Sequence, residues 1–406
     1  MKRVKFIHAA DLHLDSPMVG LKSLPSSIFS RLQESTFVAL ERIVNKAIEE
    51  KVDFVILAGD LFDSEDRSIK AQTRLRNEMK RLLAHEIPVF AIHGNHDHLD
   101  GSWSHLDMSK NVHVFSTNVE TKLYKTASGI NLRLYGFSYP SRHVFERKIV
   151  DYKKEGEADF HIGILHGNME GSHEHGNYAP FSLKELVEKD FDYWALGHIH
   201  KRMIISQDPP VIYPGNTQGR NRKETGIKGA YIVTLEKGNP SFEFFPTSDC
   251  VWLEKEIDVS DIVGFEQLYM TCKSSIDSER EHKMGTLLKI HLTKLSKENN
   301  SNERDILNDL LEALQEDEKE EVSFVWPYAI TAEEEYNWDR ETLAKQTDFY
   351  GELFRLTDEP KELETGLDLL YQHPQVRKFL TPLTNEEKKE MIRYAESFLV
   401  KQLFKE

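Results

Sequence analysis

The sequence has little cysteine, no long apolar run and no excess of positive charge. Cys250 and Cys272 are its only thiols, which excludes a disulfide framework or a four-cysteine zinc site and fits a reducing, cytoplasmic setting. The N-terminus is basic, but its short apolar run is interrupted by Asp11. We therefore expect no signal peptide, and no stretch approaches the ~20 apolar residues of a membrane span. The formal net charge of −16 would repel nucleic acid unless a basic patch or metal ions counter it.

The length and composition predict a globular chain of more than one domain. Of its 406 residues, 39% are hydrophobic and 30% are charged, and a single domain usually has ~100–200 residues. We expect three regions, which are residues 1–240, 241–330 and 331–406.

The first region alternates short β-rich runs with helical segments. The expected strands are residues 4–10, 52–59, 88–94, 131–138, 160–167, 192–198 and 230–236. Their near-continuous apolar content predicts sheets covered on both faces, with the chemistry gathered at the carboxyl ends of the strands. The segment before Val52 carries an apolar stripe of helical period, which predicts a helix packed on a sheet; the stripe is Leu40, Ile43, Val44, Ala47 and Ile48.

The second and third regions carry no polar cluster that suggests chemistry. Residues 241–330 alternate strand and helix patterns and predict a small β-α-β-α-β module. The tail ends in a helix for which Thr384 and Glu387 form a capping-box pattern. This helix either packs on its own domain or binds a partner; its apolar face is Met391, Ala395, Phe398, Leu399 and Leu403.

Five polar clusters in the first region each follow an apolar strand. They are DLH (Asp11–His13), GDLFD (Gly59–Asp63), GNHD (Gly94–Asp97), LHGN around His166, and GHIH (Gly197–His200). Each alone is a weak signal, but the set in this order is hard to attribute to chance. A further pair, His173 and His175, is interpreted as part of a solvated loop.

These residue types are those of a centre that holds two divalent cations, which can clamp a phosphoryl group and activate water. We expect Asp60 to bridge the cations, since the neighbouring Gly59 lets other groups approach closely. Side chains at i and i+2 of an extended backbone point the same way, so Asp11 and His13 can chelate one ion, and the pair His198 and His200 has that spacing too. The remaining ligands are Asn95 and His166.

The charge of such a centre favours a phosphate ester as its substrate. Two dications carry four positive charges and the carboxylates of Asp11 and Asp60 cancel two of them, whereas imidazole and amide ligands cancel none. Mixed nitrogen and oxygen ligands suit Mn²⁺, and could accept Fe, Co or Zn. His96 is not needed as a ligand, so it can protonate the leaving oxygen, with Asp63 accepting its other ring proton. His93 is expected to be buried structure, and Asp97 to orient the turn.

The order D-x-H, GD-x-x-D, GNHD, H and GH-x-H resembles that of the calcineurin-like metallophosphoesterases. VILAGDLFD, FAIHGNHD, YWALGHIHKR and VIYPGNTQGR look like the SbcD-type double-strand-break repair nucleases, and GNTQGRNRKETG looks like their bacterial YhaO branch. The resemblance implies an α/β fold in which a metallophosphoesterase β-sandwich, flanked by helices, carries a small α/β capping domain and a helical C-terminal tail. It implies one manganese held by Asp11, His13, Asp60 and His200, a second held by Asp60, Asn95, His166 and His198, and His96 as the catalytic histidine.

The same resemblance implies what the protein acts on. Family members cleave DNA from 3′ ends and nick single strands, and they pair with an SMC-like coiled-coil ATPase of the YhaN or SbcC type. The C-terminal helices would dock that ATPase, and a homodimer is left open. Some members have a histidine where this chain has Asp63.

A basic run follows the last motif and supports DNA as the substrate. Between residues 201 and 228 only Asp208 and Glu224 oppose it, and it can track a phosphate backbone without reading bases; its members include Lys201, Arg202, Arg220, Arg222 and Lys223. An ordinary solvated turn is the alternative. Tyr213 and Trp103 could stack on a base or simply pack.

Three functions compete on this reading. The favoured one is a Mn²⁺-dependent DNA nuclease, acting as a 3′–5′ exonuclease, a single-strand endonuclease or both. The second is the same chemistry on a small nucleotide ester, which the net acidity favours. The third is a DNA-binding scaffold without catalysis, against which the intact ligand set argues.

Overall fold

The structure is a computed structural model of the 406-residue chain. It describes residues 2–403 apart from 19–20, 22–23, 64–66, 102–103, 105, 172–177, 281–282, 296–302, 319–322, 333–339, 346–348, 359–382 and 384. The predicted loop with His173 and His175, and the candidate stacking residue Trp103, lie outside the described residues.

The first of two large sheets has six strands in the order β12-β11-β1-β2-β3-β4. Strands β1 to β4 are parallel, and β11 and β12 complete one edge as an antiparallel pair. The bounds are β1 Arg3–Ala9, β2 Phe54–Ala58, β3 Val89–Ile92, β4 Val112–Val114, β11 Gly229–Glu236 and β12 Ser241–Pro246.

The second large sheet has the order β5-β6-β7-β8-β10-β9. Strands β6, β7, β8 and β10 are parallel, and β5 and β9 are antiparallel edges. The bounds are β5 Glu120–Lys125, β6 Asn131–Gly136, β7 Phe160–His166, β8 Tyr193–Gly197, β9 Met203–Gln207 and β10 Pro210–Tyr213.

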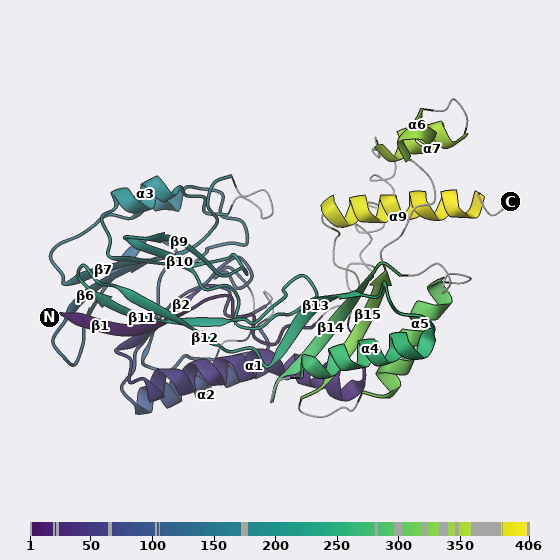
Figure 1. The fold of residues 1–406 in the computed structure, drawn as a ribbon. Coiled ribbons are helices and arrows are strands. Elements are labelled where there is room, and N and C mark those ends of the chain that lie inside the picture. The colour runs from purple at the N-terminus through teal and green to yellow at the C-terminus, as the bar shows by residue number, and fades with distance from the viewer. Residues whose placement is uncertain are drawn as a thin grey trace.

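The two sheets pack face to face and are covered outside by helices (Figure 1). Between them lies an apolar layer in which the rings of Phe6 and Phe54 stack at 4.7 Å. Helices α1 (Ser26–Glu49) and α2 (Ile69–Ala84) cover the first sheet, while α3 (Leu183–Glu188) and the 3₁₀ turn Lys148–Asp151 lie on the second. The predicted stripe of α1 is buried on the sheet, with Ile48 partly buried at its end. The predicted sheets with both faces covered are therefore confirmed.

A smaller sheet follows, with the order β13-β14-β15 and all strands parallel. Its bounds are β13 Cys250–Asp258, β14 Gly285–Thr293 and β15 Val325–Ala332, and the helices α4 (Phe265–Ser278) and α5 (Glu303–Glu316) cover it. The first turns of α1 pack on its other face, where Leu32 contacts a cluster that contains Trp252. Arg31 in the same turn donates to the Asp249 carboxylate at 2.8 Å, which joins this module to the large sheets.

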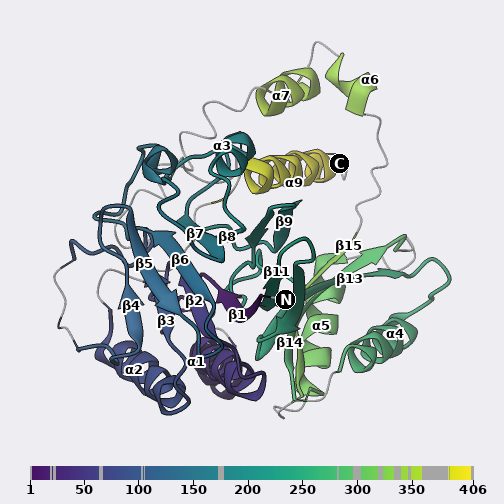
Figure 2. The same cartoon turned by 90° about the vertical axis from the view of Figure 1, so that its left-hand side faces the viewer.

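The tail is helical, as predicted. Helices α6 (Arg340–Ala344), α7 (Phe349–Asp358) and α9 (Asn385–Leu403) are described, and in both views α9 lies between α6–α7 and the sheets (Figures 1 and 2). Arg340 donates to the Glu396 carboxylate at 2.9 Å, which ties α6 to α9. In the described part of the chain no helix is both long and apolar enough to cross a membrane.

Candidate metal centre

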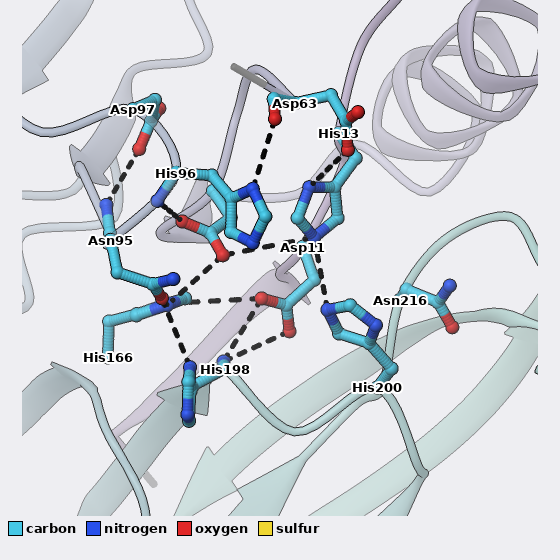
Figure 3. A network of polar contacts seen from close by, with 12 residues as sticks. Asp11, His13, Asp63, Asn95, His96, Asp97, His166, His198, His200 and Asn216 are labelled. Carbon is cyan, nitrogen blue, oxygen red and sulfur yellow. Dashed lines mark hydrogen bonds and ion pairs between the residues drawn. The ribbon is translucent and has the colours of Figure 1, made fainter. Parts of the chain in front are cut away.

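Five parallel strands of the two large sheets end at one place, and their carboxyl ends supply the predicted ligands (Figure 3). Asp11, Asp60 and Asn95 follow β1, β2 and β3, while His166 ends β7 and His198 follows β8. The backbone there is unusual, because Asp11, His13, Asp60 and His198 all have positive φ, between 43° and 99°. Such conformations cost about 1–3 kcal/mol each and gather at functional sites.

One group of predicted ligands is formed by Asp11, His13 and His200, whose ligand atoms lie within 4.8 Å of one another. The Nε2 atoms of the two histidines face each other at 3.0 Å. The Asp11 carboxylate also accepts the backbone N–H of His198, at 3.0 and 3.1 Å, which holds the GHIH turn beside it.

A second group surrounds Asn95. Its Oδ1 lies 3.1 Å from His166 Nε2 and 3.1 Å from His198 Nδ1, so one amide oxygen and two imidazole nitrogens point at a common volume. Asp60 lies between the two groups, with one carboxylate oxygen 3.3 Å from His166 Nε2 and 3.8 Å from His13 Nε2. Asp60 is therefore placed to serve both groups.

Three glycines, which have no side chain, line the backbone around this volume. A Cβ on Gly59 would lie 2.2 Å from His166 Nδ1, and one on Gly94 would lie 2.3 Å from Asp60 Oδ1. Gly197 is as restricted, because a Cβ there would lie 1.9 Å from the Ala58 carbonyl oxygen. Glycine is required for this close approach, and the buried nitrogen and oxygen donors that it admits suit divalent transition metals. The residues present therefore fit a pair of such ions.

The electrostatics of the centre also favour cations. Burial lowers the pKa of His13 to about 3, which keeps the imidazole in its neutral, ligating form. Burial would raise the pKa of Asp60, but the neighbouring His166 imidazole holds it well below its ordinary value. Although burial acts against it, the pKa of His166 is raised to about 9 because the carboxylates of Asp60 and Asp11 lie beside it. A positive charge is therefore stabilised between these two acids.

His96 stands at the side of the centre and is half-buried. Its backbone N–H donates to Asp60 Oδ1 at 2.9 Å, and its ring lies edge-on to that of His13, with centroids 4.9 Å apart. Its Nδ1 lies 3.0 Å from the backbone carbonyl oxygen of Asp63. The predicted partner residue is thus found, but the carbonyl accepts the ring proton and the carboxylate does not.

The Asp63 carboxylate has other partners. It lies 3.1 Å from Nδ1 of His13 and also pairs with Arg220. An imidazole that ligates through one nitrogen is commonly held by an acceptor at the other. The side chain of Asp63 is therefore placed to orient His13, whereas the sequence had suggested that it serves His96.

Glu224 is a residue that sequence reasoning missed as part of the site. Its carboxylate lies 2.7 Å from Nδ1 of His200 and accepts from Arg220 N and Asn216 Nδ2, each at 2.8 Å. The neighbouring Arg220 guanidinium lowers its pKa well below the ordinary value, against the effect of burial. In the sequence Glu224 was visible only as an acid interrupting a basic run.

The basic run is only partly a free surface. Arg220 is 13% exposed in its side chain and pairs with both Asp63 and Glu224, so in this structure its guanidinium lies among carboxylates, and its contact with a phosphate backbone stays a prediction. Arg222 and Lys223 lie 3.6 and 2.6 Å from the Glu387 carboxylate of α9. Lys201 and Arg202 are exposed, and Arg202 lies 3.9 Å from the centroid of the Phe244 ring.

The remaining predictions concern packing near the centre. Asp97 accepts from the backbone N–H groups of Gly94 and Leu61, and His93 lies buried against it at 2.8 Å, which confirms their structural roles. Tyr213 is 1% exposed and donates to the Gly167 carbonyl, so it packs and does not stack on a base.

Two sheets packed face to face, with imidazoles and carboxylates gathered where their parallel strands end, define a metal-dependent phosphoesterase. The chain belongs to the calcineurin-like phosphoesterase family, whose model matches residues 4–202. It is 41% identical over 402 residues to "Uncharacterized metallophosphoesterase YhaO" of Bacillus subtilis (strain 168), which covers 98% of this chain and 97% of that protein. The predicted membership of the family and its YhaO branch is confirmed.

Two further similarities are weaker. Over 289 residues the chain is 24% identical to "DNA double-strand break repair protein Mre11" of Methanopyrus kandleri, covering 64% of this chain and 60% of that protein. A solved dimetal phosphatase from Danio rerio aligns with a TM-score of 0.37 at 13% identity, over 60% of this chain and 96% of that chain. Structural similarity at this level supports no inference about function.

Proposed function

We propose that this metallophosphoesterase is a Mn²⁺-dependent DNA nuclease that hydrolyses phosphodiester bonds from 3′ ends, within single strands, or both. The observation that carries the proposal is that side chains from five strand ends converge around Asp60 with His96 beside them. The similarity to the archaeal Mre11 protein supports DNA as the substrate, and the exposed Lys201 and Arg202 next to the last motif support contact with a phosphate backbone.

The ligand sets follow from the two groups of side chains. Asp11, His13, Asp60 and His200 would hold one cation, and Asp60, Asn95, His166 and His198 the other. Mn²⁺ is proposed for these mixed ligands, and Fe, Co or Zn are the alternatives. When bound, the cation pair supplies positive charge to the phosphoryl oxygens and lowers the pKa of the attacking water.

The protein's own groups orient these ligands and move the proton. The carboxylates of Asp63 and Glu224 each hold the Nδ1 side of one histidine, which leaves the Nε2 atoms of His13 and His200 directed at the centre. The Nδ1–H group of His96 donates a hydrogen bond to the Asp63 carbonyl oxygen. We assign to its Nε2 the proton that the leaving oxygen receives, a step that contributes about 10²–10⁴-fold to rate.

The helical tail is proposed as the docking element for an SMC-like coiled-coil ATPase. On α9 the side chains of Met391, Tyr394, Phe398 and Leu399 are 41–46% exposed. Four large apolar side chains within nine positions of a helix are typical of a helix that lies in a partner's groove. Association with this partner, like association with DNA, is part of the proposal.

The decisive assay separates DNA from a small ester as the substrate. Purified protein is incubated with end-labelled linear duplex, with circular single strands and with bis-p-nitrophenyl phosphate, each in Mn²⁺ or EDTA. Mn²⁺-dependent loss of labelled DNA is expected. Hydrolysis of the small ester without cleavage of either DNA would support a nucleotide-ester phosphodiesterase, and binding of DNA without any hydrolysis would support a scaffold.

A further inference from the structure

A partly exposed group of aromatic rings adjoins the metal centre on the side of His198. The rings are those of His143, Phe145 and Tyr178, which we call the aromatic shelf. Their planes differ by only 8° to 17°, and the three centroid separations are 5.7, 5.7 and 6.0 Å. Because these separations are nearly equal, the rings form a triangle that shares one orientation and cannot be a column of successive stacked rings.

A hydrogen bond shows how two of the rings are arranged. The Nδ1 atom of His143 lies 3.0 Å from the hydroxyl of Tyr178, and the lone pair or proton of an imidazole nitrogen lies in the ring plane. With planes only 16° apart, this hydrogen bond holds the two rings next to each other in a near-parallel orientation. The ring of Phe145 has nearly the same orientation, and this residue is 63% exposed, so apolar ring surface remains open to solvent.

The shelf is rigidly attached to the centre. The ring of Tyr178 meets that of His198 edge to face, with centroids 5.3 Å apart. The backbone of Tyr178 exchanges two hydrogen bonds with the fully buried Asn168, which follows β7. Val144, between the two exposed residues, is 1% exposed and its carbonyl accepts the N–H of Ala179. These backbone hydrogen bonds hold the rings beside the proposed cation ligand His198.

We infer that the aromatic shelf binds the base of an unpaired nucleotide next to the phosphodiester at the metal centre. This inference rests on the proposed nuclease function and narrows its substrate to an unpaired strand or strand end. A base inside a duplex is already stacked on both faces, whereas an unpaired base can exchange a neighbouring base for an aromatic side chain. Such stacking tolerates any sequence because every base has a π-face. The buried Tyr213 offers no such surface.

The test compares oligonucleotides that carry or lack a base. Full-length protein with Ca²⁺ in place of Mn²⁺ is titrated with fluorescent single strands that are intact or have an abasic site at one of the last three 3′ positions. With the native protein, one abasic position should weaken binding about tenfold. The double variant Phe145→Ala, His143→Ala should bind the intact strand about tenfold more weakly and no longer distinguish it from the abasic one. Both residues are exposed, so the variant should fold.

Controls separate failure of the shelf from failure of the nuclease proposal. Phe265 is exposed at the start of α4, in the small module, and Phe265→Ala should behave as the native protein. Equal discrimination against the abasic strands by the native protein and the double variant overturns the aromatic shelf. Absence of DNA binding in the native protein, together with retained hydrolysis of bis-p-nitrophenyl phosphate, instead rejects the nuclease function. Tighter binding by the double variant would also overturn the inference, because the rings would then obstruct DNA.

Discussion

The backbone N–H of His96 donates to the Asp60 carboxylate at 2.9 Å. The proposed proton donor is thus attached to the carboxylate proposed to serve both cations by a backbone group that substitution with alanine leaves in place. Its ring makes a separate contact, to the Asp63 carbonyl. Ligand geometry and proton transfer therefore depend on different atoms of the same residue, and mutation can separate them.

The first prediction uses that separation. His96→Ala should lower the rate of phosphodiester hydrolysis by about 10²–10⁴-fold and leave metal uptake near that of the native protein, because the backbone bond to Asp60 remains. Hydrolysis of bis-p-nitrophenyl phosphate and metal content after dialysis are the two measurements. Asp60→Asn is the contrasting variant and should lose both. If His96→Ala lost its metal as well, His96 would be a ligand and not a proton donor.

The second prediction concerns Glu224. Glu224→Gln retains the size of the side chain but replaces the charged acceptor that holds His200 at 2.7 Å, and loss of such a partner typically weakens metal affinity 10- to 100-fold. Isothermal titration calorimetry with Mn²⁺ measures this affinity without requiring activity. Glu279→Gln, which alters a partly exposed pair with Lys255, should retain the native affinity. An unchanged Mn²⁺ affinity for Glu224→Gln would falsify its assignment as a positioning residue.

The third prediction concerns the contact between α9 and the basic run. If Glu387 competes with phosphates for Arg222 and Lys223, Glu387→Gln should tighten DNA binding and make the dependence of log K on log salt steeper, by about one per additional phosphate contact. Arg222→Ala with Lys223→Ala should make it shallower.

Binding isotherms at several salt concentrations provide the measurement for this third prediction. The control is Glu254→Gln, which removes an exposed acid paired with Lys289 in the small sheet and should change neither affinity nor slope. Identical salt slopes for native protein, Glu387→Gln and the double alanine variant would show that Arg222 and Lys223 do not contact DNA.

The fourth prediction is a pH dependence of stability that arises from His8. This fully buried imidazole is held between the Tyr193 hydroxyl and the Leu196 carbonyl, at 2.9 and 3.1 Å, and burial lowers its pKa to about 3. Below the ordinary value near 6.5 the unfolded chain binds a proton that the native state does not. Stability is therefore lost as pH falls from about 6.5 towards 3, by up to ~1.4 kcal/mol per pH unit.

Urea unfolding at pH 7, 6 and 5 in EDTA tests this fourth prediction. Removing the group by His8→Gln should lessen the decline in the free energy of unfolding across that range by about 1.4 kcal/mol per unit. Replacing the exposed His85 in the same way should not alter the decline. Parallel curves for native protein and His8→Gln would mean that His8 binds a proton as readily in the folded state as in the unfolded chain.

Much of the fold, and the meeting of the proposed ligands at one place, could be predicted because both follow from local patterns. Apolar runs of seven or eight residues predicted β1, β2, β3, β7 and β8, and side chains that directly follow parallel strands lie together where those strands end. The strands β4, β5, β9, β10 and β12 were not predicted. The half-exposed residues of β4, β5, β9 and β12 carry no continuous apolar signal, and β10 is buried but has only four residues, the first of them proline.

The partners of those ligands depended on contacts between distant segments. No local sequence pattern predicts that Arg220 pairs with Asp63, which lies 157 positions away in the chain. Nor does one predict that the Asp63 carbonyl, and not its carboxylate, contacts His96. A carboxylate can accept from any donor within reach, so only the packing of the β2 turn against the loop after β10 selects its partner. The same holds for Glu387, which the sequence offered as part of a helix cap and the structure pairs with the basic run.

The sequence by itself determined the kind of chemistry, because ligand type and spacing along a strand are local properties that set which ions and which charge a centre can hold. Tertiary structure decided which basic side chains are exposed to a substrate, which acids orient the histidines and where aromatic rings stay exposed. These depend on distances between segments far apart in the chain. Such distances are set when the sheets and the tail pack together, and no short stretch of residues encodes them.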